Sequence, residues 1–356
     1  MTLKNPLTST IAKSLAGGVL AAALAVSAAS ADEPRKRWKM HSAFGSNVSI
    51  LGPAGLRIAD NITKLSGESI RVKFFEPGAL VPGIQYFDAV ASGSIPIAYG
   101  SPGYNMGQES ALAFFAAVPF GPGFAEYNAW VFHAGGYELL DEIYGKYNIK
   151  SVLCAMIPPE SSGWFREEIK SLDDLKGLKM RFFGLGARVM EKVGVSTQLL
   201  AGGDIYTALE LGSIDATEFS MPSIDESYGF FQIAKHYYFP GWHQPSSYGE
   251  IAINMDEWNS LSELQHLVID TVCKANIMEE FSEAESLQGA AMGRMEKDHG
   301  VQVHRWSDET IEVLRGHWED VADEMAAGDP TFKKVWEHYS AFRETHKIWR
   351  TRGYLK

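Results

Sequence analysis

Two periods of hydrophobic residues recur along the chain and predict alternating strands and helices. Residues 69–75 alternate apolar side chains at every second position, which is typical of a half-buried strand. Residues 52–65 place Leu56, Ile58 and Ile62 close to helical spacing, which indicates an amphipathic helix. Similar patterns predict strands at residues 38–43 and 95–99 and a helix at residues 85–91. This βαβαβ order predicts a parallel sheet.

A second α/β pattern follows residue 150 and then gives way to helices. Its strands are predicted at residues 152–157, 178–183, 197–200 and 213–219. Ser171 and Asp174 form a capping box for one helical turn, and Asp204 is predicted to cap a helix that ends at Leu211. A further helix is predicted at residues 187–193. Long amphipathic helices are predicted at residues 260–288, 307–326 and 330–349.

The length of 356 residues exceeds that of one ordinary domain, so these patterns predict an α/β protein with two lobes and long C-terminal helices. We expect residues 32–157 and 247–290 to form the first lobe. Residues 158–246 and 291–356 are expected to form the second lobe and its C-terminal helices.

Residues 1–31 have the organisation of a cleaved signal peptide. Lys4 and Lys13 precede an apolar run, and an Ala-Ser-Ala sequence ends at Ala31. The alternative is a membrane anchor, but the run is shorter than the roughly 20 residues needed to span a bilayer. We therefore expect an exported, periplasmic protein.

Composition and charge exclude several classes of protein. Apolar residues make up 46% of the chain, which argues against disorder, and the net charge of -12 provides no basic surface for nucleic acid. Cys154 and Cys273 are the two cysteines, too few for a disulfide-rich scaffold or a four-cysteine zinc site. Because both lie in apolar or helical surroundings, we expect two buried, unpaired thiols, with a single bridge as the alternative.

The common catalytic motifs are absent from the sequence, including HExxH, CxxC, GxSxG and the P-loop. Gly184 and Gly186 imitate the start of a dinucleotide fingerprint, but Val189 stands at its last position. His243 is expected to be a surface histidine, with ligand contact as the alternative. We therefore expect a binding protein rather than an enzyme.

Polar and aromatic residues gather at four predicted strand ends, at residues 158–165, 179–181, 214–219 and 237–245. Ligands of open α/β sheets bind at the carboxyl ends of strands. Arg181 lies in an apolar strand, where its guanidinium could pair with a ligand carboxylate or form a structural salt bridge to an interdomain acid. Glu218 is a carboxylate in an apolar run and needs a cation or a hydrogen-bond donor.

Three of these segments resemble the substrate-binding subunits of TRAP transporters of the DctP type. They contain Lys-Met-Arg-Phe, Ile-Asp-Ala-Thr-Glu and Pro-Gly-Trp-His, within residues 178–186, 203–218 and 237–243. The resemblance extends over nearly the whole chain after residue 31 and is strongest to the branch that binds 2-oxo and 2-hydroxy acids. It implies a two-lobed periplasmic binding protein that closes like a hinged clamp and delivers an organic acid to a membrane permease.

The resemblance also implies roles for individual residues. Arg181 corresponds to the arginine that clamps the ligand carboxylate. Glu160, Glu218, Gln244 and the backbone carbonyl of Phe219 correspond to the ligands of a metal ion, with Glu160 in place of a glutamine and Gln244 in place of a glutamate. These oxygen donors suit Na⁺ or Ca²⁺.

Charge balance favours Ca²⁺ at this site. Two protein carboxylates, one ligand carboxylate and the arginine sum to a charge that a divalent ion neutralises. The alternative is that the exchanged residues have removed the metal site and Glu160 pairs with a basic group.

The expected pocket walls are aromatic. Tyr104 matches a pocket tyrosine of the family, Phe219 replaces the usual tryptophan, and Trp242 belongs to the Pro-Gly-Trp-His segment. Phe44 is a further candidate wall, with a plain core role as the alternative. Small residues before Tyr104 predict a roomier pocket, so an aromatic or longer acid is as plausible as pyruvate or lactate.

The sequence leaves two alternative functions and the oligomeric state undecided. An exported metal-dependent enzyme could use Glu160 and Glu218, and a binding protein could instead serve a chemosensor. The aromatic C-terminal segment, residues 330–356, is expected either to pack on the second lobe of its own chain or to exchange between two copies and form a homodimer.

Overall fold

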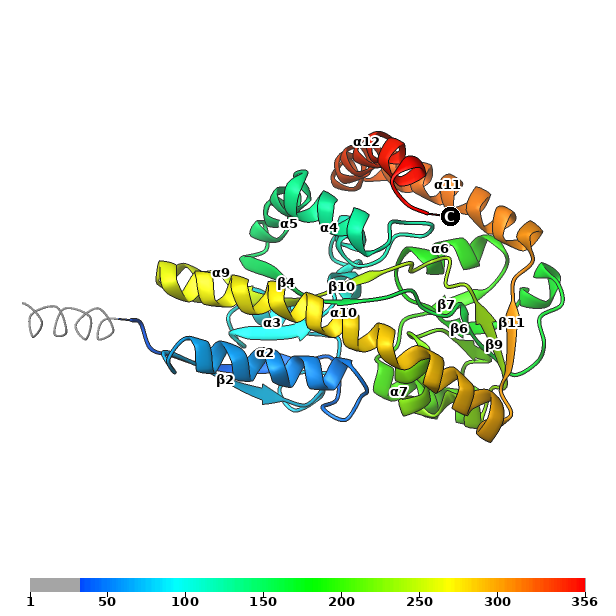
Figure 1. The fold of residues 1–356 in the computed structure, drawn as a ribbon, viewed down its shortest axis with the longest axis horizontal. Coiled ribbons are helices and arrows are strands. Elements are labelled where there is room, and N and C mark those ends of the chain that lie inside the picture. The colour runs from blue at the N-terminus through cyan, green and yellow to red at the C-terminus, as the bar shows by residue number, and fades with distance from the viewer. Residues whose placement is uncertain (1–32, 356) are drawn as a thin grey trace, which may run out of the picture.

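The computed structural model describes residues 33–355 and contains two β-sheets with helices packed around each (Figure 1). The first sheet has five strands in the order β2-β1-β3-β10-β4, and the second has six in the order β11-β9-β5-β8-β6-β7. We call each sheet with the helices packed on it a lobe. This architecture confirms the predicted two-lobed α/β fold, whereas the predicted signal peptide lies outside the described residues.

The first sheet is mixed. Its strands are β1 (Lys36–Ser42), β2 (Ile70–Phe75), β3 (Ile97–Gly100), β4 (Ile149–Ile157) and β10 (Ser247–Asn254). β1 pairs in parallel with β2 and β3, as the βαβαβ pattern predicts. β10 is antiparallel to β3 and β4 because the chain re-enters this lobe from the second one, so the prediction of a parallel sheet is wrong for these strands.

Helices cover the first sheet and continue along its edge. They are α2 (Leu51–Leu65), α3 (Phe87–Ala91), α4 (Phe124–His133) and α5 (Gly136–Gly145), with the 3₁₀ turns η1 (Pro102–Asn105) and η2 (Ser110–Phe115). Ile58 and Ile62 of α2 are fully buried, as their spacing predicts. Leu56 and Leu65 are exposed, so the buried face of α2 is narrower than its apolar pattern.

The second lobe is built from shorter elements than the sequence predicts. Its strands are β5 (Gly163–Phe165), β6 (Lys179–Arg181), β7 (Ser196–Gln198), β8 (Ala216–Thr217), β9 (His236–Phe239) and β11 (Gln302–Arg305). Its helical elements are η3 (Leu172–Leu175), α6 (Gly184–Lys192), α7 (Gly202–Glu210), α8 (Pro222–Tyr228) and η4 (Phe230–Gln232). The predicted capping box at Ser171 is present. Asp204 does not cap α7: it lies in the first turn, where its charge still favours the helix dipole.

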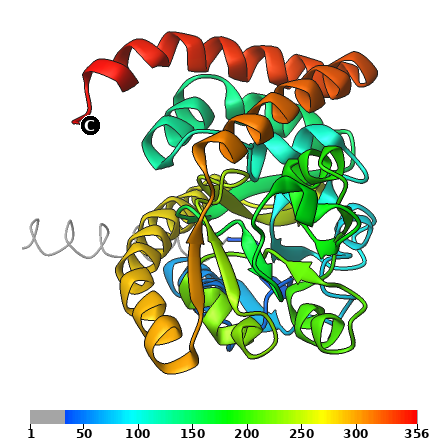
Figure 2. The same ribbon diagram turned by 90° about the vertical axis from the view of Figure 1, so that its right-hand side faces the viewer.

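One long helix joins the two lobes. α10 (Glu263–His299) follows the short α9 (Met255–Asn259) and packs against β4 and α2 at one end and against α8 and η4 at the other (Figures 1 and 2). α11 (Asp308–Gly328) packs on α6, and α12 (Pro330–Arg352) packs on η2, α4 and α5. These three elements belong to the first lobe, so the expected packing of the C-terminal segment on the second lobe is wrong. The predicted residue boundaries of the lobes stay a prediction.

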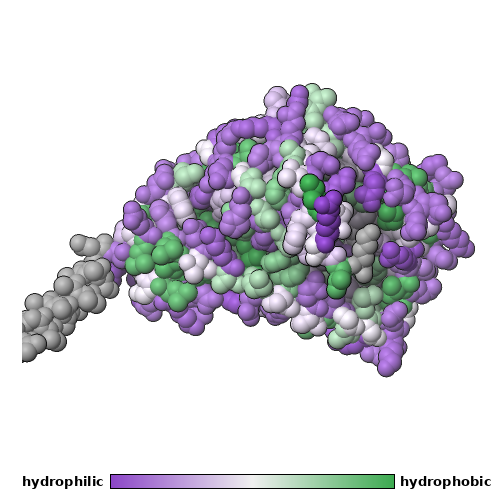
Figure 3. All heavy atoms as spheres, turned by 45° about the horizontal axis from the view of Figure 1, so that its top comes forward, coloured by the Kyte–Doolittle hydropathy of each residue, from purple (hydrophilic) through white to green (hydrophobic). Residues whose placement is uncertain are grey.

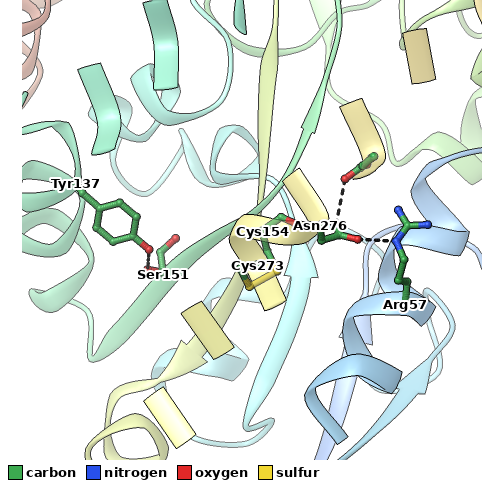
Figure 4. The surroundings of a disulfide bond; sticks show 7 residues. Arg57, Tyr137, Ser151, Cys154, Cys273 and Asn276 are labelled. Carbon is green, nitrogen blue, oxygen red and sulfur yellow. Dashed lines mark hydrogen bonds between the residues drawn. A yellow bond between two sulfur atoms is a disulfide. The ribbon is translucent and has the colours of Figure 1, made fainter. Parts of the chain in front are cut away.

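A disulfide bond fixes α10 to the first sheet. Cys154 of β4 and Cys273 of α10 are bonded, with 4.0 Å between their Cα atoms, so the prediction of two free thiols is wrong (Figure 4). The apolar residues around each cysteine suggested buried thiols because they form the faces through which α10 and β4 pack against each other. A separation of 119 residues hid this proximity in the sequence.

The outer surface is mainly polar. In Figure 3 polar residues dominate the displayed face, and apolar residues occur there in small groups. Within residues 33–355, none of the helices has the length and apolar character needed to cross a membrane.

Candidate functional site

Two connecting segments between the lobes lie against each other and carry predicted site residues. Glu160 lies in the connection from β4 to β5, and Gln244 lies in the connection from β9 to β10. The Glu160 amide donates to the Gln244 carbonyl (3.3 Å), and the Gly241 amide donates to the Glu160 carbonyl (2.9 Å). A Cβ at Gly241 would lie 2.3 Å from that carbonyl oxygen. The glycine of Pro-Gly-Trp-His therefore permits the contact that brings Glu160 next to Gln244.

A cavity of about 50 Å³ lies where these connections meet both lobes. Six of the predicted site residues line it, namely Phe44, Tyr104, Glu160, Arg181, Phe219 and Gln244. Ser220, Tyr99, Tyr248 and Glu280 also line it and were not predicted. The cavity is therefore walled by residues from both lobes, both connections and α10.

Arg181 is buried at the end of β6, and two of its three guanidinium nitrogens donate hydrogen bonds to other residues. Its Nη1 donates to Glu218 Oε1 (2.6 Å) and to the Glu218 carbonyl (2.9 Å), and its Nε donates to the Leu200 carbonyl (3.3 Å). Nη2 has no hydrogen bond to any described residue. Arg181 thus forms a salt bridge, but with an acid of its own lobe and not with the interdomain acid of the alternative prediction.

Several buried acceptors near Arg181 lack partners among residues 33–355. Glu160 Oε1 accepts from Ser220 Oγ (2.9 Å), but Glu160 Oε2 accepts no hydrogen bond. Glu218 Oε2 and Gln244 Oε1 are likewise buried without a donor. No lysine or arginine in the described part of the chain pairs with Glu160, so the basic group that the alternative role requires could only be His243, whose Nε2 lies 3.9 Å from Glu160 Oε2.

His243 belongs to this cluster, and the expectation of a surface histidine is wrong. Its side chain is 1% exposed, and its Nε2 lies 3.5 Å from Glu218 Oε2 and 3.9 Å from Glu160 Oε2. A Cβ at Gly186 would lie 2.7 Å from the His243 Cβ. The Gly-Leu-Gly sequence that imitated a nucleotide fingerprint thus makes room for this ring. Glu160, Glu218 and His243 can each offer a metal ligand atom, and these atoms lie within 4.8 Å of one another.

Burial and neighbouring charge set opposite ionisation states for the two glutamates. Burial, followed by the charges of Glu218 and Asp225, raises the pKa of Glu160 well above its usual range. Burial would also raise the pKa of Glu218, but Arg181 and His243 outweigh it and lower that pKa. The surroundings therefore favour the charged form of Glu218 and the protonated form of Glu160.

Aromatic rings close the sides of the cavity. The Tyr104 ring lies 6.1 Å from Phe44 and 5.3 Å from Phe183, and the Arg181 guanidinium carbon lies 5.1 Å from the Phe219 ring centre. A Cβ at Gly103 would lie 2.3 Å from Phe183. The Phe183 ring thus occupies the space beside Gly103, so this glycine does not enlarge the pocket.

Trp242, which was predicted to contact the ligand, lies outside the cavity lining. It stacks on Phe120, with 5.6 Å between ring centres.

Comparisons with known proteins identify the family of the chain. Residues 42–329 match the DctP family, described as bacterial extracellular solute-binding protein, family 7. The chain is 34% identical over 317 residues to a monocarboxylate 2-oxoacid-binding periplasmic protein of Nostoc sp. strain PCC 7120, covering 89% of this chain and 86% of the relative.

Two solved structures share both fold and sequence. A TRAP transporter solute-binding protein of Bordetella bronchiseptica RB50, with calcium and picolinate, has a TM-score of 0.87 and 29% identity, covering 90% of this chain and 95% of that one. A TRAP periplasmic solute-binding protein of Pseudoalteromonas atlantica T6c, with sodium and pyruvate, has a TM-score of 0.85 and 28% identity, covering 88% and 96%.

These relatives are solute-binding proteins and not enzymes, which confirms the predicted binding function and argues against the exported metal-dependent enzyme. The match covers most of the chain, and the solved relatives have the same two-lobed architecture. The chain therefore belongs to the DctP family of bacterial extracellular solute-binding proteins, to which the TRAP transporter subunits resembled by its sequence also belong.

Proposed function

We propose that this protein captures a short 2-oxo or 2-hydroxy acid together with a metal ion and delivers it to a TRAP permease in the membrane. One observation carries the proposal: Arg181 lines one small cavity together with Glu160 and Gln244, which each carry an unpartnered buried oxygen. Glu218, outside the lining but bonded to Arg181 and close to Glu160, carries a third. Such a site offers a donor for a carboxylate and acceptors for a cation.

Arg181 would bind the ligand carboxylate. Its Nη1 is held by Glu218, which fixes the plane of the guanidinium, and Nη2 remains for an oxygen of the acid. Because the ring of Phe219 lies under the guanidinium, the arginine would lose little conformational freedom when the ligand binds.

The chemistry of the donor set fits a hard cation. Glu160, Glu218, Gln244 and the Phe219 carbonyl, as predicted, would hold the ion through oxygen, and His243 adds one nitrogen. A bound cation would also compensate the two buried carboxylates and displace the proton of Glu160. Charge balance with the acid and Arg181 favours Ca²⁺ over Na⁺; the relatives contain calcium in one structure and sodium in another.

The size of the cavity and the relatives support a small acid. A volume of about 50 Å³ suits a compact ligand better than a long one. The Nostoc relative is a monocarboxylate 2-oxoacid-binding protein, and the solved relatives hold picolinate and pyruvate. We therefore place pyruvate or lactate ahead of longer acids, with a small aromatic acid as the alternative.

The disulfide bond supports export of the protein from the cytoplasm. Bridges such as Cys154–Cys273 persist in oxidising compartments and are rare in the cytosol, which supports a periplasmic location and a cleaved signal peptide at residues 1–31. The membrane partner would be the TRAP permease. A gene neighbourhood without permease subunits would instead favour a chemosensor partner.

Native mass spectrometry of protein purified with its natural ligand tests the proposal. We expect a mass increment equal to one small monocarboxylic acid plus one calcium or sodium ion, and calorimetric binding of pyruvate or lactate after the ligand is removed. A co-purified ligand without a carboxylate, or no binding of any short acid, would contradict the proposal.

A further inference from the structure

A second set of unpartnered polar atoms faces the same cavity from the first lobe. Tyr99 of β3 and Glu280 of α10 both line the cavity and are fully buried. Their hydroxyl oxygen and Oε1 lack hydrogen-bond partners in the described part of the chain. Buried polar atoms are nearly always paired in folded proteins, so each of these two calls for an explanation.

Glu280 is held in place by only one of its oxygens. Asn276, one turn earlier on α10, donates to Glu280 Oε2 (3.4 Å) and to the Cys154 carbonyl (2.7 Å), next to the disulfide. The Asn276 Oδ1 accepts from Arg57 Nε (2.8 Å), and Figure 4 shows Asn276 pointing from α10 toward Arg57. This chain of contacts fixes the carboxylate and leaves Oε1 free.

Tyr99 is fixed by close packing of its ring. A Cβ at Gly55 would lie 2.8 Å from the ring, so the glycine lets α2 approach it, and Phe44 packs edge-on at 5.4 Å. The Tyr99 hydroxyl therefore cannot turn away toward solvent to find a partner. Arg57 Nη2 is a third buried atom without a partner, on the α2 side of Glu280.

The three groups act on one another electrostatically. Burial raises the pKa of Glu280 well above its usual range, and the charge of Arg57 lowers it in part. The pKa of Tyr99 is raised by burial and by Glu280 and is lowered by Arg57. Tyr99 and Glu280 also line the same cavity, so one ligand can meet both groups.

The donors and acceptors of this cluster define what it can bind. Tyr99 can donate or accept a hydrogen bond, and Arg57 can only donate. Glu280 Oε1 accepts when the group is ionised and can donate when it is protonated, the form that its raised pKa favours. A hydroxyl group serves either form, because it can donate one hydrogen bond and accept another between Glu280 and Tyr99. A methyl group at the same place would leave all of these atoms unpaired.

We propose that Tyr99 and Glu280 form a second polar subsite that recognises a hydroxyl at the end of the ligand remote from its carboxylate. The inference rests on the proposed function, since Arg181 must hold the other end of the acid. The preferred ligand is then a short 2-oxo or 2-hydroxy acid with an additional terminal hydroxyl. Glycerate would bind more tightly than lactate, and 3-hydroxypyruvate more tightly than pyruvate.

Calorimetry with these two pairs of acids tests the subsite in protein freed of its natural ligand and supplied with Ca²⁺. We expect each hydroxylated acid to bind roughly tenfold more tightly than its partner, as two added hydrogen bonds should achieve. Tyr99→Phe removes one of the two hydrogen bonds, so it should reduce that ratio to about threefold and leave the affinity for lactate and pyruvate nearly unchanged. Tyr206→Phe is the control, because it also removes a tyrosine hydroxyl but lies on α7 outside the cavity lining, where the hydroxyl donates to Gln232 Oε1 (3.2 Å).

The outcomes separate the two proposals. Equal affinities within each pair for the unmodified protein, as expected if water alone fills the subsite, would overturn the subsite and leave the proposed function standing. A preference that survives both Tyr99→Phe and Glu280→Leu would also overturn it. Failure to bind any of the four acids would overturn both proposals.

Discussion

The guanidinium of Arg181 has two roles, an ion pair with Glu218 and the proposed binding of the ligand carboxylate, which substitutions can separate. One nitrogen neutralises Glu218 inside the second lobe, and another faces the cavity. Arg181→Ala should weaken acid binding by about 2 to 5 kcal/mol, because a desolvated charge pair is lost. Arg181→Lys keeps a charge beside Glu218 but loses the planar fork, so it should fold normally and bind with intermediate affinity.

Calorimetry measures both affinities, and circular dichroism establishes that the two variants are folded. Near-native affinity of Arg181→Ala would remove this residue from the carboxylate site.

Glu250 gives the fold a pH dependence that is independent of the ligand site. It is fully buried in the first lobe, accepts from Tyr144 (2.7 Å) and Tyr86 (3.2 Å), and burial raises its pKa to about 7. The folded state therefore holds this proton more tightly than the unfolded state. The resulting stabilisation is complete below pH 4.5, the usual pKa, and is lost as the pH rises through about 7.

Urea unfolding between pH 4.5 and 8 tests this dependence. The free energy of unfolding of the native protein should fall, relative to that of Glu250→Gln, by about 3 kcal/mol across this range. Glu319→Gln, on the exposed side of α11, is the control and should run parallel to the native protein. A constant difference between native protein and Glu250→Gln would contradict the assigned pKa.

At the scale of elements, the disulfide between β4 and α10 should be a main source of stability. It closes a segment of 119 residues, so it removes many conformations from the unfolded chain. Replacing Cys154 and Cys273 together by alanine should lower the free energy of unfolding by roughly 2 to 5 kcal/mol. Reducing the native protein with dithiothreitol should give the same loss in urea unfolding, and an unchanged midpoint in both experiments would refute this role.

Elements that depend on local pattern could be predicted from the sequence. The α2 helix and the Ser171 capping box follow from spacing and side-chain chemistry over a few residues. The reversed direction of β10 could not be predicted, because it depends on the route by which the chain returns from the second lobe.

The candidate site shows the same limit. Motif resemblance pointed to Arg181 and Glu160, which do line the cavity, whereas the burial of His243 depends on the packing of Gly186 beside it. Tyr99 and Glu280 were missed because each lies in an ordinary strand or helix pattern. Their unpartnered atoms become visible only once α10 is placed across β3 and β4.

At the scale of the whole molecule, α12 offers a surface for a second copy of the chain. Its first half is anchored, since Phe332 and Tyr339 are buried and pack on Phe114 of η2. Ile348 and Trp349 near its end are 62% and 58% exposed. We predict a homodimer through this end of the helix, and one relative was described as a dimer.

Light scattering at micromolar concentration should therefore give twice the monomer mass. Substituting both Ile348 and Trp349 by serine should produce a folded monomer, whereas Leu211→Ser, an equally exposed apolar residue of the second lobe, should remain dimeric. A monomer mass for the native protein would contradict the predicted dimer.

The central claim is that acid and metal ion bind as a unit between Arg181 and the oxygens of Glu160, Glu218 and Gln244. Because linkage is reciprocal, the ion must then strengthen acid binding. The most direct measurement is calorimetric titration of pyruvate into protein that has been exhaustively chelated in sodium-free buffer, with and without added Ca²⁺. The account predicts binding that is weak or absent without a metal and restored by Ca²⁺, and the same affinity under both conditions would contradict it.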